Sequence, residues 1–146
     1  MDVEDAQMCV KAGADAIVVS NHGGRQLDGT VSSISAMCPI IDALEGTGVE
    51  VHMDGGIRSG QDALRALCMG AKGVYIARPY LYGLGAGGEA GVTRSLEILR
   101  KEMDISMAFC GERDIKNVGM HNLVSCPAEF GAGPCGKDAA TNKPIC

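Results

Sequence analysis

Three short strand-like segments recur along residues 1–119, each preceded by a helical pattern and followed by a polar turn rich in glycine. The segments are residues 16–19, 50–53 and 73–76. Short apolar strands that alternate with helices are typical of a parallel sheet covered by helices. The pattern therefore predicts an α/β fold, and its spacing fits both a doubly wound sheet and a (β/α) barrel.

Start and stop signals place the helices between these segments. Gly13 is a natural C-cap for the first helix, and Pro39 suits the first position of the second. Ser59, three residues before Asp62, resembles a capping box for a helix through residue 69. A long helix is expected from about residue 88, with one apolar stripe formed by Val92, Leu96, Leu99 and Met103.

The pattern stops after Gly119. Residues 120–146 contain three of the five prolines and no apolar periodicity, so we expect one domain over 1–119 and a poorly ordered tail over 120–146. Cys126, Cys135 and Cys146 lie in this tail. Because they include no C-x-x-C pair, a zinc site is not expected.

Charge and hydropathy exclude several classes of partner. A net charge of −5 without a Lys/Arg cluster argues against nucleic acid or an anionic membrane surface. No apolar run reaches the roughly 20 residues that a membrane span needs, and "MDVEDAQMC" lacks a signal-peptide core. We therefore expect a soluble, cytoplasmic protein in which Cys9, Cys38 and Cys68 are buried thiols.

The turn after the first strand, "SNHGGRQLDG" at residues 20–29, contains His22 and Arg25. Functional residues of parallel α/β folds gather where strands end at their carboxyl edge. A histidine is suited to accept a proton at neutral pH, and an arginine is suited to bind a carboxylate. A lone histidine here would be read as a surface residue, but the pair indicates a site that deprotonates a small carboxylic acid.

The turn after the second strand, "DGGIRSG" at residues 54–60, fits a phosphate site. Backbone N–H groups and the N-terminus of the next helix would face the anion beside Arg58, and Arg78 could close the site from the third strand. The same residues also fit an ordinary βα turn. Asp54 would repel phosphate and suits a hydroxyl or an N–H group better. His52 is expected to pack in the core, and His121 is given no role.

These motifs, in this order, resemble the FMN-dependent 2-hydroxy-acid oxidases and dehydrogenases, the family of glycolate oxidase, lactate oxidase and cytochrome-type L-lactate dehydrogenase. The resemblance rests on "SNHGGRQLDG", on "DGGIRSGQDALRALCMGAKGVYIARPYLYGLGAGGEAGV" and on "LEILRKEMDISMAFCGERDIKNV", and it covers residues 2–119. It implies the C-terminal portion, about strands six to eight, of a (β/α)8 TIM barrel with an irregular C-terminal tail. It also implies a homo-oligomer or a missing N-terminal half.

The resemblance assigns roles to individual residues. His22 would accept the proton of an L-2-hydroxy acid that is oxidised to a 2-oxo acid, and Arg25 would bind the substrate carboxylate. No metal is implied. Ala77 stands where the family usually has glycine. The FMN cofactor would be held by Ser20, Asp54, Gly55, Gly56, Ile57, Arg58, Ala77 and Arg78.

Family members also use a lysine, two tyrosines and an aspartate from segments before strand six, and no residue here matches them. We therefore expect little or no turnover from the 146-residue chain alone. The alternative is a non-catalytic FMN- or phosphate-binding half-barrel that associates with itself or with a separate N-terminal piece. Another phosphate-binding barrel enzyme is a third possibility, against which "SNHGGRQ" counts.

Overall fold

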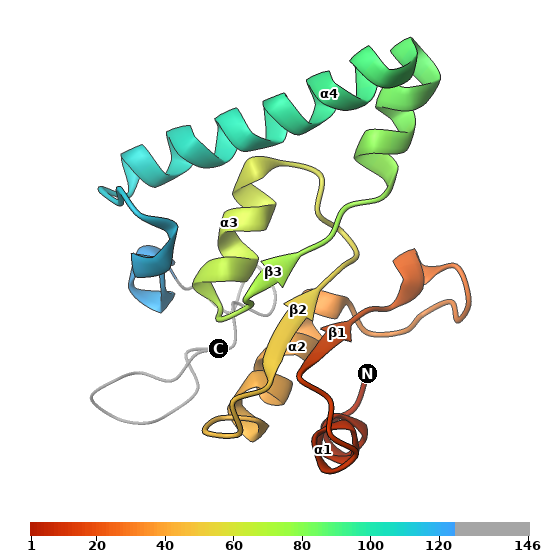
Figure 1. Cartoon of the computed structure of the whole chain (residues 1–146), viewed down its shortest axis with the longest axis vertical. Coiled ribbons are helices and arrows are strands. Elements are labelled where there is room, and N and C mark those ends of the chain that lie inside the picture. The colour runs from red at the N-terminus through yellow and green to blue at the C-terminus, as the bar shows by residue number, and fades with distance from the viewer. Residues whose placement is uncertain (125–146) are drawn as a thin grey trace.

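A parallel three-stranded sheet lies at the centre of residues 1–124, which are the part of the chain that the computed structural model describes (Figure 1). The strands are β1 (Ala16–Val19), β2 (Glu50–Met53) and β3 (Gly73–Val74), in the order β1-β2-β3. The predicted bounds of β1 and β2 are confirmed. β3 is shorter than predicted because its pairing with β2 ends at Val74, and the next helix begins at Arg78.

Within residues 1–124, four α-helices follow the alternating order that the sequence predicts. They are α1 (Val3–Lys11), α2 (Ser33–Ala43), α3 (Gly60–Cys68) and α4 (Arg78–Phe109). Single 3₁₀ turns, η1 (His22–Gly24), η2 (Ile115–Asn117) and η3 (Met120–Asn122), complete the described elements. The predicted tail and its three cysteines lie outside the described residues from 125 onward.

Only one face of the sheet is packed by helices within the described residues. Val51 and Met53 point to the helical side, where the buried cluster includes the fully buried Met37. On the other face Val18 and Tyr75 are each 50% exposed. The predicted covering of the sheet by helices is therefore confirmed for one face only, since no described element covers the other.

Helix α2 contains Pro39 in its interior, whereas the sequence suggested Pro39 as its first residue. The helix begins earlier because Ser32 caps it, its Oγ accepting the N–H of Ser35 at 3.3 Å. A mid-helix proline lacks the N–H for one backbone bond, which normally destabilises a helix. The helix persists because its inward face is buried in the core cluster on the sheet, through Ala36, Met37 and Ile40.

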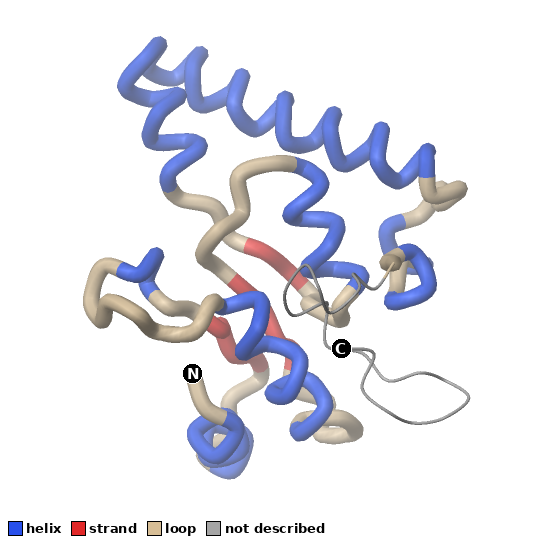
Figure 2. The backbone as a smooth tube through the Cα atoms, turned by 180° about the vertical axis from the view of Figure 1, so that it is seen from behind, coloured by secondary structure: helices blue, strands red, loops and turns tan. Residues whose placement is uncertain are grey.

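Helix α4 also differs from its prediction. It begins at Arg78, with Pro79 in its first turn, and bends where Gly87 and Gly88 leave the helical conformation. Figures 1 and 2 show a short first arm and a long second arm that passes over α3. A side chain on Gly91 would overlap the carbonyl oxygen of Gly83, so glycine permits the two arms to lie close together. Leu96, expected on the apolar stripe, is 50% exposed.

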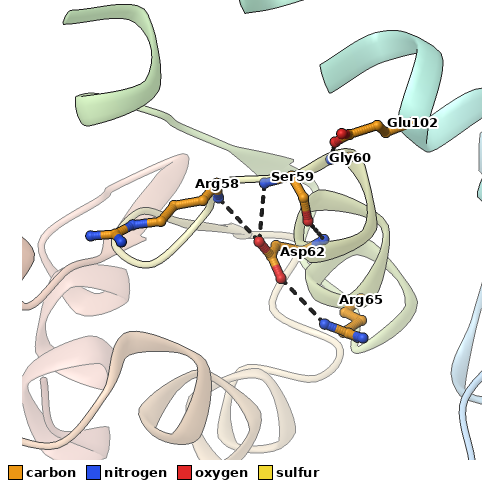
Figure 3. Close-up of polar contacts among 6 residues, drawn as sticks. All are labelled: Arg58, Ser59, Gly60, Asp62, Arg65 and Glu102. Carbon is orange, nitrogen blue, oxygen red and sulfur yellow. Dashed lines mark hydrogen bonds and ion pairs between the residues drawn. The ribbon is translucent and has the colours of Figure 1, made fainter. Parts of the chain in front are cut away.

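The capping box predicted at the start of α3 is confirmed (Figure 3). Ser59 Oγ accepts the N–H of Asp62 at 3.1 Å, and Asp62 Oδ2 accepts the N–H groups of Ser59 at 3.0 Å and Arg58 at 3.1 Å. The N–H of Gly60 donates to Glu102 Oε2 of α4 at 2.8 Å. Four hydrogen bonds thus fix the end of the loop that precedes α3.

Replacement of Gly60 by alanine is expected to destabilise the protein by about 1–3 kcal/mol. The added Cβ would meet the backbone of α4 at Leu99, Glu102 and Met103, which cannot move without shifting the helix. Urea unfolding would measure the loss as a lower midpoint. Gly85→Ala is the matched control, since it lies in α4 with open space around it and gains helix propensity. Equal midpoints for the two variants would contradict the close packing of α3 on α4.

The described cysteines only partly follow the expectation. Cys38 and Cys68 are buried, as predicted, whereas Cys9 is exposed because α1 turns Ala6 inward and Cys9 outward. Burial raises the pKa of the Cys68 thiol, and the nearby Cys110 adds to the rise. Among residues 1–124, no helix has the length and apolar character to cross a membrane.

Candidate active site

The carboxyl ends of the three strands surround one cavity of about 510 Å³. Three loops line it: residues 21–25 after β1, residues 54–58 after β2 and residues 75–79 after β3, together with Leu81. Every predicted site residue except Ser20 contributes to this lining. Ser20 is half-buried beneath the first loop and accepts the N–H of His22 at 3.1 Å.

His22 occupies the left-handed region with φ of +53°, the only non-glycine residue to do so in the described part of the chain. Such a conformation costs a non-glycine residue about 1–2 kcal/mol. Hydrogen bonds within the turn offset the cost: Asn21 Oδ1 accepts the N–H of Gly23 at 3.0 Å, and the Asn21 carbonyl accepts that of Gly24 at 2.9 Å. The turn therefore holds the exposed imidazole at the edge of the cavity.

The predicted pair of His22 and Arg25 is brought together. Arg25 Nη2 lies 3.2 Å from His22 Nε2. A guanidinium only donates hydrogen bonds, so Nε2 is the acceptor in this contact. Arg25 forms no ion pair with a described carboxylate, and its remaining N–H donors are open to a ligand.

The second loop approaches the first because Gly55 has no side chain. A Cβ on Gly55 would lie 2.9 Å from Asn21 Oδ1 and 3.0 Å from Ser33 Oγ. Gly55 and Gly56 both have positive φ, of +88° and +83°, which favours glycine. Ile57 is buried in the core cluster, so only its backbone can face a ligand.

Asp54 has a buried carboxylate oxygen, Oδ1, without a hydrogen-bond partner among the described residues. Buried polar atoms are rarely left unpaired in proteins, because the lost hydration is costly. A ligand that donates a hydrogen bond, such as a hydroxyl, would satisfy this oxygen. The expectation that Asp54 meets a hydroxyl or an N–H group is consistent with this geometry.

The helix N-terminus that faces the cavity differs from the expected one. Asp62 already binds the N–H groups of Arg58 and Ser59, just before α3, and Glu102 binds the N–H of Gly60, the first residue of that helix (Figure 3). Helix α4 instead begins at the cavity wall, where its N-cap Ala77 provides no side-chain hydrogen bond. The φ of −131° at Ala77 suits any residue, so alanine fits where the family usually has glycine.

The charges around the cavity favour an anion. Arg25, Arg58 and Arg78 line it with one aspartate, and none of the three forms an ion pair among the described residues. Arg58 is exposed, while the half-buried Arg78 donates from Nη2 to the carbonyl oxygen of Gly23 at 2.7 Å. The cationic lining contrasts with the net charge of −5 of the whole chain.

Two residues of the site were missed by sequence reasoning. Asn21 lines the cavity and bonds the turn internally, and its N–H donates to Ser33 Oγ at 3.0 Å. Ser33 is 2% exposed at the start of α2. Asn21 could have been found as a neighbour of His22, since short amide side chains often bond their own turn. Nothing in the sequence marks Ser33, twelve positions away.

The other histidines lie outside the cavity lining. His52 was expected in the core but is half-buried on the uncovered sheet face, with Nε2 3.0 Å from Glu50 Oε2 and its ring stacked on Tyr75. That expectation is wrong because β2 alternates, so Val51 and Met53 take the helical side. His121 and Asn122 donate hydrogen bonds to Glu112 and hold the pKa of that carboxyl below its usual value.

Residues 1–125 match the protein family described as FMN-dependent dehydrogenase. The sequence is 52% identical over 118 residues to an L-lactate dehydrogenase of Caulobacter vibrioides, covering 81% of this chain and 30% of that protein. It is 46% identical over 127 residues to an L-lactate dehydrogenase of Stenotrophomonas maltophilia, covering 87% and 33%.

Solved structures of similar proteins also match the chain over only part of their length. The structure resembles mandelate oxidase with benzoyl-formic acid, at a TM-score of 0.76 and 47% identity, over 80% of this chain and 34% of that one. A mandelate oxidase variant with a monooxide FMN adduct gives the same score and identity, with 37% of its chain covered. The chain thus spans about a third of the length of the relatives that it matches.

Proposed function

Because the chain belongs to the FMN-dependent dehydrogenase family, and its fold is a part of that family's (β/α)8 barrel, we propose that it forms the flavin-phosphate and proton-accepting part of a 2-hydroxy-acid dehydrogenase or oxidase. The reaction is the oxidation of an L-2-hydroxy acid, such as lactate or glycolate, to the 2-oxo acid. One observation carries the proposal: a single cavity joins a His–Arg pair to two further arginines that form no ion pair within residues 1–124.

The residues present fit FMN. Asp54 Oδ1 would accept a hydroxyl of the ribityl chain, and this would satisfy the buried oxygen that has no described partner. Arg58, Arg78 and the open N-terminus of α4 would bind the phosphate, with the backbone of Gly55, Gly56 and Ile57 beside it. When bound, FMN would accept the two electrons that the substrate loses.

His22 and Arg25 would act on the substrate. A guanidinium binds a carboxylate through two parallel hydrogen bonds, so Arg25 would orient the acid at the cavity edge. His22 Nε2 would accept the proton released during oxidation once Arg25 turns to the substrate carboxylate, because Arg25 occupies the electron pair of this nitrogen in the observed contact. Ser20 would hold the turn through the His22 N–H.

Replacement of Arg58 by alanine is expected to weaken FMN binding about tenfold or more, the contribution of one hydrogen bond from a charged donor. Riboflavin, which lacks the phosphate, should bind both forms equally. Quenching of flavin fluorescence would give both dissociation constants. Arg100→Ala, exposed on α4 and outside the cavity, is the control. Equal losses of FMN and riboflavin affinity would contradict a phosphate contact at Arg58.

A second candidate is a non-catalytic FMN-binding half-barrel that associates with a second copy or with a separate N-terminal piece. The uncovered sheet face, with Val18 and Tyr75 half exposed, favours association through this side. In that case His22→Ala still binds FMN and Arg58→Ala does not. Neither variant nor the unchanged chain oxidises a 2-hydroxy acid in any assembly. For either candidate we propose a reducing, cytoplasmic setting, in line with Cys9, Cys68 and Cys110, which form no disulfide among the described residues.

A further inference from the structure

Arg78 makes a contact that phosphate binding does not require. Its Nη2 donates to the carbonyl oxygen of Gly23 at 2.7 Å, joining the first residue of α4 to the turn after β1, 55 positions earlier. A Cβ on Gly23 would lie 2.7 Å from the same nitrogen, so the glycine permits this approach. The accepting residue, Gly23, directly follows His22.

Few other hydrogen bonds hold the turn after β1 from outside the turn itself. The hydrogen bonds of Ser20 and Asn21 to the N–H groups of His22 and Gly23 span two positions each, within the turn itself. Ser33 holds the start of the turn through the Asn21 N–H. Among the described residues that follow α2 in the sequence, Arg78 alone forms a hydrogen bond to this turn.

The backbone of His22 makes such a support important. A non-glycine residue at φ of +53° keeps that conformation only where its surroundings hold it. We propose that Arg78 is a positioning residue for the proton acceptor: through Gly23 it fixes the turn that places His22 and Arg25 at the cavity. The inference rests on the proposed function for calling His22 the proton acceptor, but the contact itself does not depend on it.

The guanidinium of Arg78 can serve both ends of the cavity. It has five N–H donors in a rigid plane, and the bond to Gly23 uses one of its terminal nitrogens. The remaining donors can meet a phosphate between Arg78 and Arg58. A phosphate bound there would immobilise the same side chain that holds the turn. Phosphate binding beside Arg58 and the order of the turn that contains His22 are therefore coupled.

Arg58 provides a matched comparison. It lines the same cavity and carries the same charge, but its exposed side chain makes no hydrogen bond to the turn in the described part of the chain. Loss of Arg58 should therefore affect phosphate binding alone. Loss of Arg78 should affect both phosphate binding and the order of the turn.

Hydrogen exchange of the ligand-free chain, followed by NMR, tests the proposal. Arg78→Met keeps the length of the side chain and removes its donors. The Gly24 N–H, which donates to the Asn21 carbonyl at 2.9 Å, is expected to exchange on the order of tenfold faster in this variant. Arg58→Met should leave the Gly24 rate unchanged, and Arg78→Lys, which keeps a cationic donor, should restore part of the protection.

The Met69 N–H at the end of α3 reports general stability, since it bonds the Arg65 carbonyl far from the turn. Three results would overturn the proposal. The first is that Arg78→Met speeds the exchange of the Gly24 and Met69 N–H groups by equal factors, and the second is that it leaves Gly24 exchange at the wild-type rate. The third is that Arg78→Met and Arg58→Met change Gly24 exchange equally. Inorganic phosphate is expected to slow Gly24 exchange in the wild type and not in Arg78→Met. If phosphate changes nothing while Arg78→Met still accelerates Gly24, the positioning role stands and the proposed phosphate site fails.

Discussion

The 146-residue chain alone is expected to oxidise L-lactate about 10⁴-fold more slowly than a chimera that adds an N-terminal part. In the chimera, this chain follows the N-terminal part of the Caulobacter vibrioides L-lactate dehydrogenase. Both proteins are supplied with FMN, L-lactate and an electron-accepting dye. The imidazole of His22 hydrogen-bonds only to Arg25 among the described side chains, and no described carboxylate forms an ion pair with it. By analogy with the serine-protease triad, loss of the group that orients a catalytic histidine costs about 10⁴ in rate.

The comparison needs equal flavin occupancy, so both proteins are assayed at FMN concentrations that saturate their fluorescence titrations. The chimera joins the two sequences where the match to the relative begins, so that strand β1 gains a neighbour on its open edge. An isolated chain that oxidises L-lactate within tenfold of the chimera would contradict the view that this chain holds only part of the active site.

The parts of the fold that sequence reasoning predicted are those set by local signals. β1, β2 and the capping box at Ser59 follow from β-branched runs, glycine turns and a side chain that bonds its own backbone, all of which act over a few residues. The interior Pro39 depends on burial against the sheet, which local patterns do not contain. The early start of α4 has a local signal that sequence reasoning missed, Pro79 in its first turn.

The site was predictable to a similar extent. The three loops could be placed at one edge of the sheet because parallel strands direct their carboxyl ends together. Nine of the ten predicted residues line the cavity there. The contacts between loops were not predictable: Ser33 beneath Asn21, and Arg78 on the Gly23 carbonyl, arise from tertiary packing. The occupied N-terminus of α3 was missed because Glu102 reaches it from 42 positions away.

In the same chimera, replacement of His22 by alanine is expected to lower kcat by about 10²–10⁴, the usual contribution of a positioned general base. FMN binding should remain unchanged, because the phosphate contacts proposed for Arg58 and Arg78 come from other loops. His121→Ala is the control, since that histidine is exposed and pairs with Glu112 outside the cavity.

The most direct test of the account is the rate at which L-lactate bleaches the flavin absorbance of the chimera in the absence of oxygen. We expect His22→Ala to bind FMN with unchanged affinity and to bleach about 10²–10⁴-fold more slowly, with His121→Ala at the unchanged rate. Bleaching by His22→Ala at the rate of the unchanged chimera would contradict the claim that the turn after β1 supplies the proton acceptor.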